Sequence, residues 1–349
     1  MTQKIFVGLS GGVDSAVSAA LLQEQGHDVV GVFIKIWQPE FTECTWREDR
    51  LDAMRVCAAL GIPFREVDLS DEYKREVVER MVSDYCSGIT PNPDVLCNAH
   101  IKFGSFAKWA KEEGAERIAT GHYAQIEQSQ DNILTWKLLR AHDTSKDQSY
   151  FLYRLGQQDL ARALFPVGGM LKTEVRALAQ KFNLPVSRKP DSQGLCFVGE
   201  VSMADFLKRF IPVVRGPVVC EGQIVGEHEG AALYTVGQRH GFSATGADHP
   251  YYVVKIDIST NTLSVSPHRE DAAQAKVELH DVHWVYREPM LPHTLLAQAR
   301  YHEQPIAVTL GRQEGKLFVT FEKPHIVSPG QSLVLYEGDV CLGGGIIKR

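Results

Sequence analysis

Gly8-Leu-Ser-Gly-Gly-Val-Asp-Ser15 stands between an expected strand and an expected helix, and this position decides the fold of the first part of the chain. Lys4 to Leu9 is apolar enough for a buried strand, and Ala16 to Gln25 is rich in helix formers that Gly26 ends. A turn from strand to helix aims free backbone N–H groups and the positive end of the helix dipole at one point. Such a point suits a phosphate group.

The small residues of this stretch fit phosphate binding. Gly11 and Gly12 let the main chain approach an anion and adopt φ values that other residues avoid, while Ser10 and Ser15 add hydroxyl donors. Asp14 either caps the helix or helps to hold a metal ion. The Walker pattern with its lysine and the dinucleotide pattern G-x-G-x-x-G are both absent. For a bare Ser-Gly-Gly, an ordinary strand-to-helix turn is the alternative.

The complete S-G-G-V-D-S motif resembles the PP-loop of the ATP pyrophosphatases. This resemblance implies that the loop grips the pyrophosphate of ATP while the AMP part is passed to an oxygen of the substrate.

The composition is that of a globular protein with two or three domains. The 349 residues are 44% hydrophobic and 23% charged, and 37 basic against 43 acidic residues give a formal charge of −6. A nucleic-acid site must therefore be a local basic patch. No apolar run approaches the ~18 residues of a membrane span, so we expect a cytosolic protein without membrane contact.

The first part of the chain alternates between expected strands and helices. After the first strand and helix, strands are expected at 28–36, 64–68 and 117–120, and helices at 47–60, 73–85 and 103–113. This order predicts right-handed βαβ units and a parallel sheet covered on both faces, with ligands beyond the carboxyl ends of the strands.

Two loops are expected at that same edge. Thr90 to Asn98 carries two prolines that hold its backbone extended, and Thr120-Gly-His-Tyr123 follows a strand. Ordinary turn chemistry is the alternative for both loops, and His122 alone is more often a plain polar residue than a ligand. Their position after strands favours a functional use.

The remaining segments predict a change of architecture near residue 210. An exposed hairpin is expected at 126–139, and the basic stretch 172–189 carries a local charge of +4 that is either a solvated helix face or a docking site for a phosphate backbone. After a short helix at 202–210, short β-prone runs separated by Gly and Pro indicate small β domains. We expect three domains: a parallel-sheet α/β domain at 1–210, a small β domain at 211–274 and a β-barrel at 275–349.

The seven cysteines argue against a disulfide framework and against a metal site. Their number is odd, and no C-x-x-C pair occurs, since the closest spacings are Cys44 with Cys57 and Cys86 with Cys97. Cys97 and Cys196 both fall in loops expected at the open edge of the sheet. One thiol could accept a persulfide and the other reduce it, leaving a disulfide, although two buried small hydrophobes are the alternative.

Further motifs widen the resemblance to nearly the whole chain. They are T-P-N-P-D-V-L-C-N (90–98), A-T-G-H-Y (119–123), K-D-Q-S-Y-F-L (146–152), F-P-V-G (165–168), D-S-Q-G-L-C-F (191–197), Y-T-V-G-Q-R (234–239), P-G-Q-S (329–332) and C-L-G-G-G-I-I (341–347). In this order they resemble the bacterial tRNA-specific 2-thiouridylases. The resemblance implies an adenine nucleotide alpha hydrolase-like domain and a tRNA-uridine 2-sulfurtransferase that acts on the wobble uridine of tRNAs for lysine, glutamate and glutamine.

The resemblance also assigns roles to residues of this chain. It implies that ATP, with Mg²⁺, adenylates the C2 oxygen of uridine, that Cys196 bears the persulfide and that Cys97 attacks it to form a Cys97–Cys196 disulfide. Asp94 is the implied acid–base group. The implied ATP site comprises Gly8, Leu9, Ser10, Gly11, Gly12, Val13, Asp14, Ser15, Ile34 and Gly121. The implied tRNA contacts are Asn92, Pro93 and Asp94 at the target base, and His122, Lys146, Asp147, Gln148, Arg300, Tyr301 and Gln331 elsewhere. Since the uridine must leave the base stack before its C2 atom can be reached, a close-fitting pocket is expected.

Two other functions fit the PP-loop. One is a ligase that activates a small-molecule oxygen, as in the GMP and argininosuccinate synthetases, which need no thiols. The other is a tRNA-binding module whose nucleotide site is vestigial. The sequence does not identify the persulfide donor, either a cysteine desulfurase or a relay protein. We expect a monomer, with mobility at 90–98 and 191–197 before tRNA binds.

Overall fold

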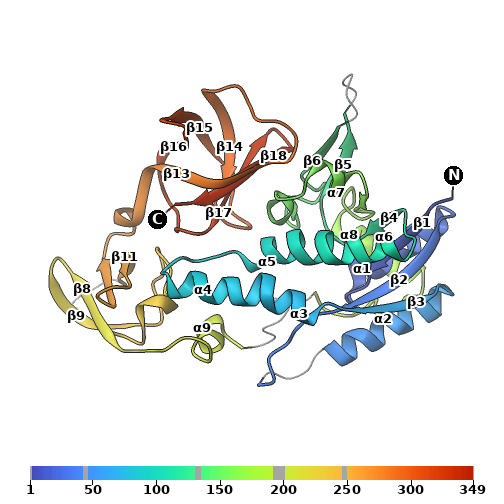
Figure 1. Ribbon diagram of the computed structural model, residues 1–349, viewed down its shortest axis with the longest axis horizontal. Helices are drawn as coiled ribbons and strands as arrows, with labels where there is room; N and C mark the ends of the chain where they lie inside the picture. The colour runs from blue at the N-terminus through green and yellow to red at the C-terminus, as the bar shows by residue number, and fades with distance from the viewer. Residues whose placement is uncertain (1, 42–45, 130–134, 192–200, 246–249, 349) are drawn as a thin grey trace.

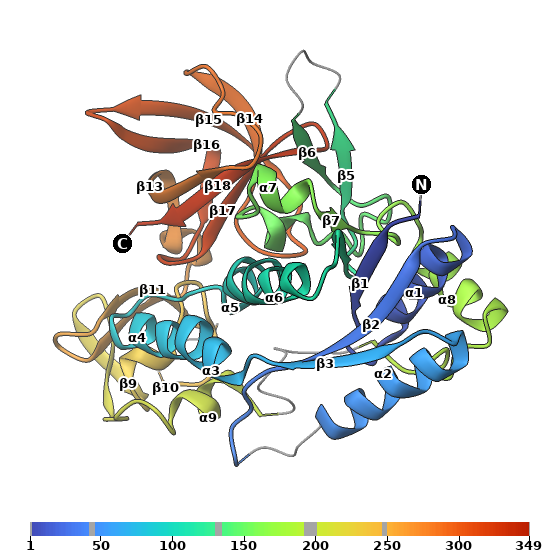
Figure 2. The same ribbon diagram turned by 45° about the vertical axis from the view of Figure 1, so that its right-hand side comes forward.

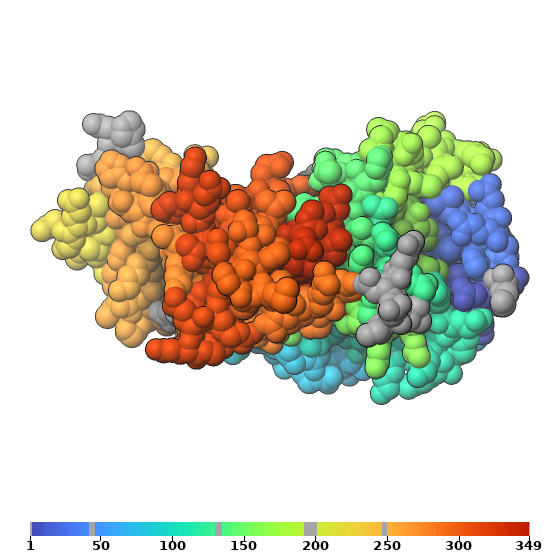
Figure 3. All heavy atoms as spheres, turned by 90° about the horizontal axis from the view of Figure 1, so that it is seen from above, coloured from blue at the N-terminus to red at the C-terminus, as the bar shows by residue number. Residues whose placement is uncertain are grey.

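The computed structural model describes residues 2–41, 46–129, 135–191, 201–245 and 250–348. It has three parts: a parallel sheet with helices at the amino-terminal end, a small sheet at the opposite end, and a barrel above the helices that join them (Figure 1). Seen from above, the barrel lies between the other two parts (Figure 3). Within the described ranges no helix combines the length and the apolar character that crossing a bilayer requires.

The amino-terminal sheet is fully parallel and has the order β3-β2-β1-β4-β7. Its strands are β1 (Lys4–Gly8), β2 (Asp28–Lys35), β3 (Phe64–Asp68), β4 (Arg117–Ala119) and β7 (Ala163–Leu164). The predicted α/β fold is therefore confirmed. Because the chain leaves β1 toward β2 and later returns to β4 on the other side, a crevice is expected between the ends of β1 and β4.

Alternate residues of β1 pack against two helical layers, as the period of a strand requires. Ile5 and Val7 belong to the core with α1 (Val13–Glu24), α2 (Trp46–Leu60) and α8 (Lys172–Lys181). Phe6 belongs to the core on the other face. The helices of that face are α3 (Ser70–Tyr73), π-helix η1 (Lys74–Glu79), α4 (Arg80–Cys86), α5 (Pro93–Leu96), π-helix η2 (Cys97–Ser105) and α6 (Phe106–Glu112). Figure 2 shows the two layers on either side of the sheet.

The predicted loop at 90–98 is wrong over its second half. Asn92 caps a helix, its side chain accepting from Val95 N–H at 3.3 Å, and Pro93 occupies the first helical position, where its missing N–H costs nothing. From there α5, η2 and α6 run on without a break to Glu112. The helix expected from residue 103 thus begins ten residues earlier.

The two strands of the hairpin predicted at 126–139 pair with each other as expected, and one of them also pairs with the last domain. Its strands are β5 (Gln125–Gln128) and β6 (Trp136–Leu139), and β6 lies antiparallel to β18 (Val340–Ile347). Leu138 is fully buried by this pairing. The domain limits at 210/211 and 274/275 stay predictions, since two strands of the first segment extend the sheet of the third.

The two remaining sheets are formed by the second half of the chain. The central one has the order β10-β9-β8-β12-β11, from β8 (Gly216–Cys220), β9 (Gln223–His228), β10 (Ser243–Ala244), β11 (Tyr252–Asp257) and β12 (Thr262–Ser266). The last comprises β13 (Ala273–Trp284), β14 (His293–Gln298), β15 (Ile306–Gln313), β16 (Lys316–Ile326), β17 (Ser332–Glu337) and β18. Pairing of β13 with β18 closes it, so the predicted β-barrel is confirmed.

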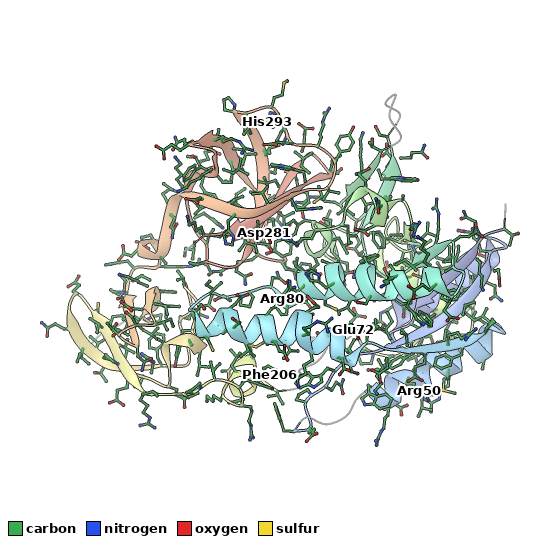
Figure 4. The ribbon with its side chains drawn as sticks, viewed as in Figure 1. Arg50, Glu72, Arg80, Phe206, Asp281 and His293 are labelled. Carbon is green, nitrogen blue, oxygen red and sulfur yellow. The ribbon has the colours of Figure 1, made fainter. Side chains whose placement is uncertain are left out.

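Short helices complete the described chain, and polar contacts attach the barrel to the helical layer. The short helices are η3 (Ser149–Leu152), α7 (Gln157–Leu160), α9 (Met203–Leu207), η4 (Ala231–Leu233) and η5 (Arg269–Ala272). Asp281 lies on the side of the barrel that faces α4 and α5, and its carboxylate accepts from Arg154 at 2.7 Å, whereas His293 lies at the barrel's far end (Figure 4).

Candidate active site

The loop after β1 has the geometry of an anion site, and one of its glycines adopts a conformation that other residues avoid. Gly11 has φ +73°, and a Cβ there would lie 2.6 Å from the carbonyl oxygen of Asp49. Gly12 has φ −95°, so the prediction that it too needs a φ avoided by other residues is wrong. Helix α1 begins at Val13, which leaves its first-turn N–H groups at the loop.

The loop's hydroxyl groups hold its own backbone. Ser15 Oγ accepts from the Ser10 N–H at 3.3 Å and donates to the Gly12 carbonyl at 3.2 Å. The side chains of Leu9 and Val13 are buried in the core, so only their backbone can face a nucleotide. The loop therefore offers mainly backbone groups to an anion, and we call it the backbone cradle.

The nucleotide residues expected from the resemblance converge on this cradle. A Cβ on Gly8 would meet Ile34 Cδ1 at 3.5 Å. A Cβ on Gly121 would lie 2.6 Å from the backbone nitrogen of Ser15. The segment after β4 therefore rests directly against the start of α1, at the expected crevice.

Asp14 is held by residues that the sequence analysis did not single out for this role. Lys172 Nζ lies 2.6 and 2.8 Å from its two carboxylate oxygens, and the Tyr123 hydroxyl donates to it at 2.9 Å. Lys172 also lies 2.9 Å from Asp191. Asp14 makes no side-chain cap for α1, so the capping alternative is wrong. Neither Lys172 nor Tyr123 is near Asp14 in sequence, and no local pattern predicts their contacts.

The positive charge of the basic stretch 172–189 is largely paired with neighbouring carboxylates. Four of its five basic side chains face carboxylates of the same chain, which cancels much of the +4 that the sequence suggested for docking a phosphate backbone. The pairs are Lys172 with Asp14 and Asp191, Arg176 with Asp191, Lys181 with Glu24, and Lys189 with Asp49 and Asp52.

Asp94 lies in the first turn of α5, under the barrel. Burial raises the pKa of its carboxyl group, and the nearby Lys102 ammonium partly offsets this increase. Gln331 donates 2.9 Å hydrogen bonds to the carbonyl groups of Thr90 and Pro91, just before α5. The barrel thereby holds the segment that presents Asn92, Pro93 and Asp94.

Cys97 opens π-helix η2 and is 4% exposed, so the prediction that it lies in an open loop is wrong. Cys196 lies outside the described residues, and its pairing with Cys97 stays a prediction. Burial raises the pKa of Cys57 to about 11 and that of Cys341 to about 12, so these two thiols are packing residues.

His122 is buried rather than displayed to a ligand. It is 7% exposed, and its Nδ1 lies 2.7 Å from Thr120 Oγ1 while its Nε2 lies 3.4 Å from Lys102 Nζ. Burial and then Lys102 hold its pKa well below the ordinary value, so the ring is neutral. The sequence analysis did not single out Lys102, because its place near Cys97 and His122 depends on a π-helix that no local pattern predicts.

The three consecutive residues expected to contact tRNA each bind another part of the protein. Lys146 Nζ lies 2.9 Å from Asp191, and Gln148 accepts from the Tyr123 N–H at 2.9 Å. Asp147 accepts from the backbone N–H groups of Ala141 and Ser149, at 3.0 and 3.1 Å. These contacts tie the segment to the neighbourhood of Asp14.

Two residues expected to contact tRNA, Arg300 and Tyr301, follow strand β14 of the barrel. Burial raises the pKa of Tyr301 to about 12, and the carboxylates of Asp147 and Asp94 add to the increase. Its ring lies 4.4 Å from that of Phe151 between centroids. Arg300 lies farther along and donates to the Val236 carbonyl at 3.4 Å. No cluster of three metal-ligating side chains occurs among the residues the structure covers.

Comparisons with known proteins cover nearly the whole chain. Family models described as tRNA methyl transferase HUP domain, tRNA methyl transferase PRC-barrel domain and Aminomethyltransferase beta-barrel domain match residues 3–200, 204–267 and 274–347. Proteins named tRNA-specific 2-thiouridylase MnmA are 44% identical in Stenotrophomonas maltophilia and 42% in Enterococcus faecalis. Each alignment covers 99% of this chain, and 93% and 95% of those proteins.

Among solved structures, partial similarity is found to two enzymes whose names refer to thiolated uridine. The U34-tRNA thiolase NcsA from Methanococcus maripaludis is 21% identical, with a TM-score of 0.37 over 56% of this chain and 62% of that one. A 4-thiouridine synthetase in complex with RNA and ATP is 21% identical, with a TM-score of 0.36 over 56% of this chain and 45% of that one.

Proposed function

The chain belongs to the tRNA-specific 2-thiouridylase family, and from that premise we propose that it replaces the C2 oxygen of the wobble uridine in tRNAs for lysine, glutamate and glutamine with sulfur. The observation that carries this proposal is the convergence of the PP-loop, Gly121 and Lys102 beside Asp94. The family model is described by a methyl transferase name. The relatives named as 2-thiouridylases are aligned over 93% and 95% of their own length, which supports thiolation rather than methylation.

The loop residues suit the first step, in which ATP supplies the adenylyl group that makes the C2 oxygen a leaving group. Backbone N–H groups between Gly11 and Ser15 would bind the pyrophosphate, since a helix start stabilises negative charge. Asp94 would take the N3 proton of uridine, and its raised pKa makes it a better base than an exposed carboxylate. Mg²⁺ would be held chiefly by phosphate oxygens, with Asp14 as the acid within reach of the loop.

Two thiols would carry the second step. The terminal sulfur of the Cys196 persulfide attacks C2, and the Cys97 thiolate attacks the Cys196 sulfur, so the S–S bond breaks and AMP leaves. The sulfane sulfur is thereby reduced and a Cys97–Cys196 disulfide forms, which an external dithiol must reduce before the next turnover. The persulfide comes from a donor protein, a cysteine desulfurase or a relay protein. We place this reaction in the cytoplasm and assign it to a monomer.

Nucleoside mass spectrometry tests the proposal. Unmodified lysine tRNA is incubated with ATP, Mg²⁺ and a persulfide-loaded donor, together with wild type, Cys97→Ser or Cys196→Ser. Cys86→Ser, at an exposed thiol on α4, is the matched control. We expect 2-thiouridine with wild type and the control, and none with the other two variants. Pyrophosphate release without any thiolated base would instead favour the ligase alternative, and absence of both products would favour a tRNA-binding module.

A further inference from the structure

Lys102 lies inside the candidate site on the same helix as Cys97. In a π-helix the backbone hydrogen bonds join residues five apart, so Lys102 lies one turn beyond Cys97. π-Helices are rare and are frequently found at functional sites. The side chain is partly buried, which is unusual for a lysine because burial removes the ammonium from water.

The contact with His122 fixes the arrangement of protons. An ammonium group has only donors, so His122 Nε2 accepts from Lys102 Nζ across their 3.4 Å separation. The ring proton is then on Nδ1 and is donated to Thr120 Oγ1 at 2.7 Å. Thr120 and His122 are therefore a neutral support that orients the lysine, and His122 does not itself supply positive charge.

The ammonium has a connection to each half of the proposed reaction. One connection is to Asp94, whose carboxyl group it influences electrostatically. The other is through His122, which follows Gly121, whose Cα abuts the Ser15 nitrogen so closely that a Cβ would stand 2.6 Å away. The pyrophosphate end of ATP belongs at Ser15 and the uridine at Asp94. The phosphate that joins them, the α-phosphate, must then pass near Lys102.

We propose that Lys102 is a further catalytic residue, whose ammonium group binds the non-bridging oxygens of the α-phosphate while the adenylyl group moves to uridine. This assignment rests on the proposed function. In that step a bond forms between uridine O2 and the α-phosphorus, the bond from this phosphorus to the bridging oxygen breaks, and pyrophosphate leaves with the electron pair. The N3 proton goes to Asp94.

The physical reason for a cation at this place is the movement of negative charge. With ATP and uridine bound, three phosphates, the deprotonating uridine and the Asp94 carboxylate would share one partly buried site. A fixed cation that faces the reacting phosphate stabilises the transition state without reorganising, an effect of roughly 10²–10³ in rate for one donor. The same group would remain on the phosphate when AMP departs in the sulfur step.

The test compares Lys102→Met, which removes the charge, with Lys102→Arg, which keeps it, and with Lys108→Met at an exposed lysine of α6 as the matched control. Pyrophosphate release with saturating ATP and unmodified lysine tRNA is measured, as is tRNA affinity. We expect a loss of about 100-fold or more for Lys102→Met, a loss about ten times smaller for Lys102→Arg, and no change for the control. Affinity for tRNA should change less than about threefold.

Retention of pyrophosphate release by Lys102→Met, or an equal loss in Lys102→Arg, overturns the assignment. A measurement on wild type is independent of whether the variants fold: the ¹⁵Nζ resonance of Lys102 should shift when the α,β-methylene analogue of ATP and tRNA bind, and an unchanged resonance contradicts the contact. If wild type releases pyrophosphate but makes no 2-thiouridine, the proposed function fails while this comparison still decides the role of Lys102. If wild type releases no pyrophosphate, the proposed function and the assignment of Lys102 are both wrong.

Discussion

Gly11→Ala tests whether the backbone of the loop after β1 forms the nucleotide site. The substitution has two separate effects. It places a Cβ at φ +73°, and it drives that Cβ to 2.6 Å from the Asp49 carbonyl oxygen and 2.9 Å from the Asp49 Cα. Both neighbouring atoms are backbone atoms of α2, so no side-chain rotation relieves the contact.

Two matched variants separate these effects. Gly26→Ala has the same kind of φ, +83°, with nothing within 4 Å of its Cβ. It should lower the free energy of unfolding by only about 1–2 kcal/mol. Gly121→Ala has the clash without the positive φ, its Cβ 2.6 Å from the Ser15 nitrogen, and should cost about 1–3 kcal/mol. Gly11→Ala should cost roughly the sum, about 2–5 kcal/mol.

Urea unfolding and the KM for ATP in pyrophosphate release measure the outcomes. We expect the KM to rise at least about tenfold for Gly11→Ala and Gly121→Ala, since a displacement of the first-turn N–H groups that removes 1.4 kcal/mol of binding gives that factor. For Gly26→Ala the KM should not change. An unchanged KM in Gly11→Ala, or an equal increase in Gly26→Ala, would refute the backbone-cradle argument.

Three further predictions follow from the charged groups and from the barrel. Lys172→Met removes a cation from Asp14 and should lower the free energy of unfolding, measured in urea, by about 1–3 kcal/mol. The rate of pyrophosphate release should fall as well. Burial alone raises the pKa of Asp191, but hydrogen bonds from lysine side chains, Lys172 first, lower it to about 2, below its ordinary 3.8. The stabilisation by Asp191 is therefore present above pH ~4 and is lost as pH falls toward 2. In Asp191→Asn, the free energy of unfolding measured in urea should depend less on pH over this range. Gln331→Leu removes a hydrogen bond to Thr90 and should reduce kcat more than tRNA affinity; the reverse result would make Gln331 a direct tRNA contact.

The sequence was sufficient for features that depend on local pattern. Strand β3 runs from Phe64 to Asp68 as predicted, and the strand–loop–helix at Gly8 to Ser15 lies where the alternation placed it. Parallel order and the convergence of loops at one edge followed from the βαβ rule. These features need only neighbours in sequence and a general rule of connection.

Long-range contacts and ambiguous signals account for what the sequence did not predict. The prolines of 90–98 predict an extended loop, but Asn is equally a helix cap and Pro equally a first helical residue, and only the packing of the following residues decides. Lys172 meets Asp14 across 158 positions, which no local pattern records. Gly343 belongs to a barrel strand despite the weak strand preference of glycine, because a Cβ there would lie 2.0 Å from the His283 carbonyl oxygen.

The observed contacts change how loss of function at the expected tRNA residues must be interpreted. Lys146 holds Asp191, Gln148 holds the backbone of Tyr123, and Gln331 holds the segment before Asp94. Each of these side chains already holds a segment of the candidate site. A substitution at any of them would therefore lower activity even if it never touched RNA. Direct contact can be inferred only where tRNA affinity falls and pyrophosphate release at saturating tRNA does not, because support of the site and binding of the substrate change different steps.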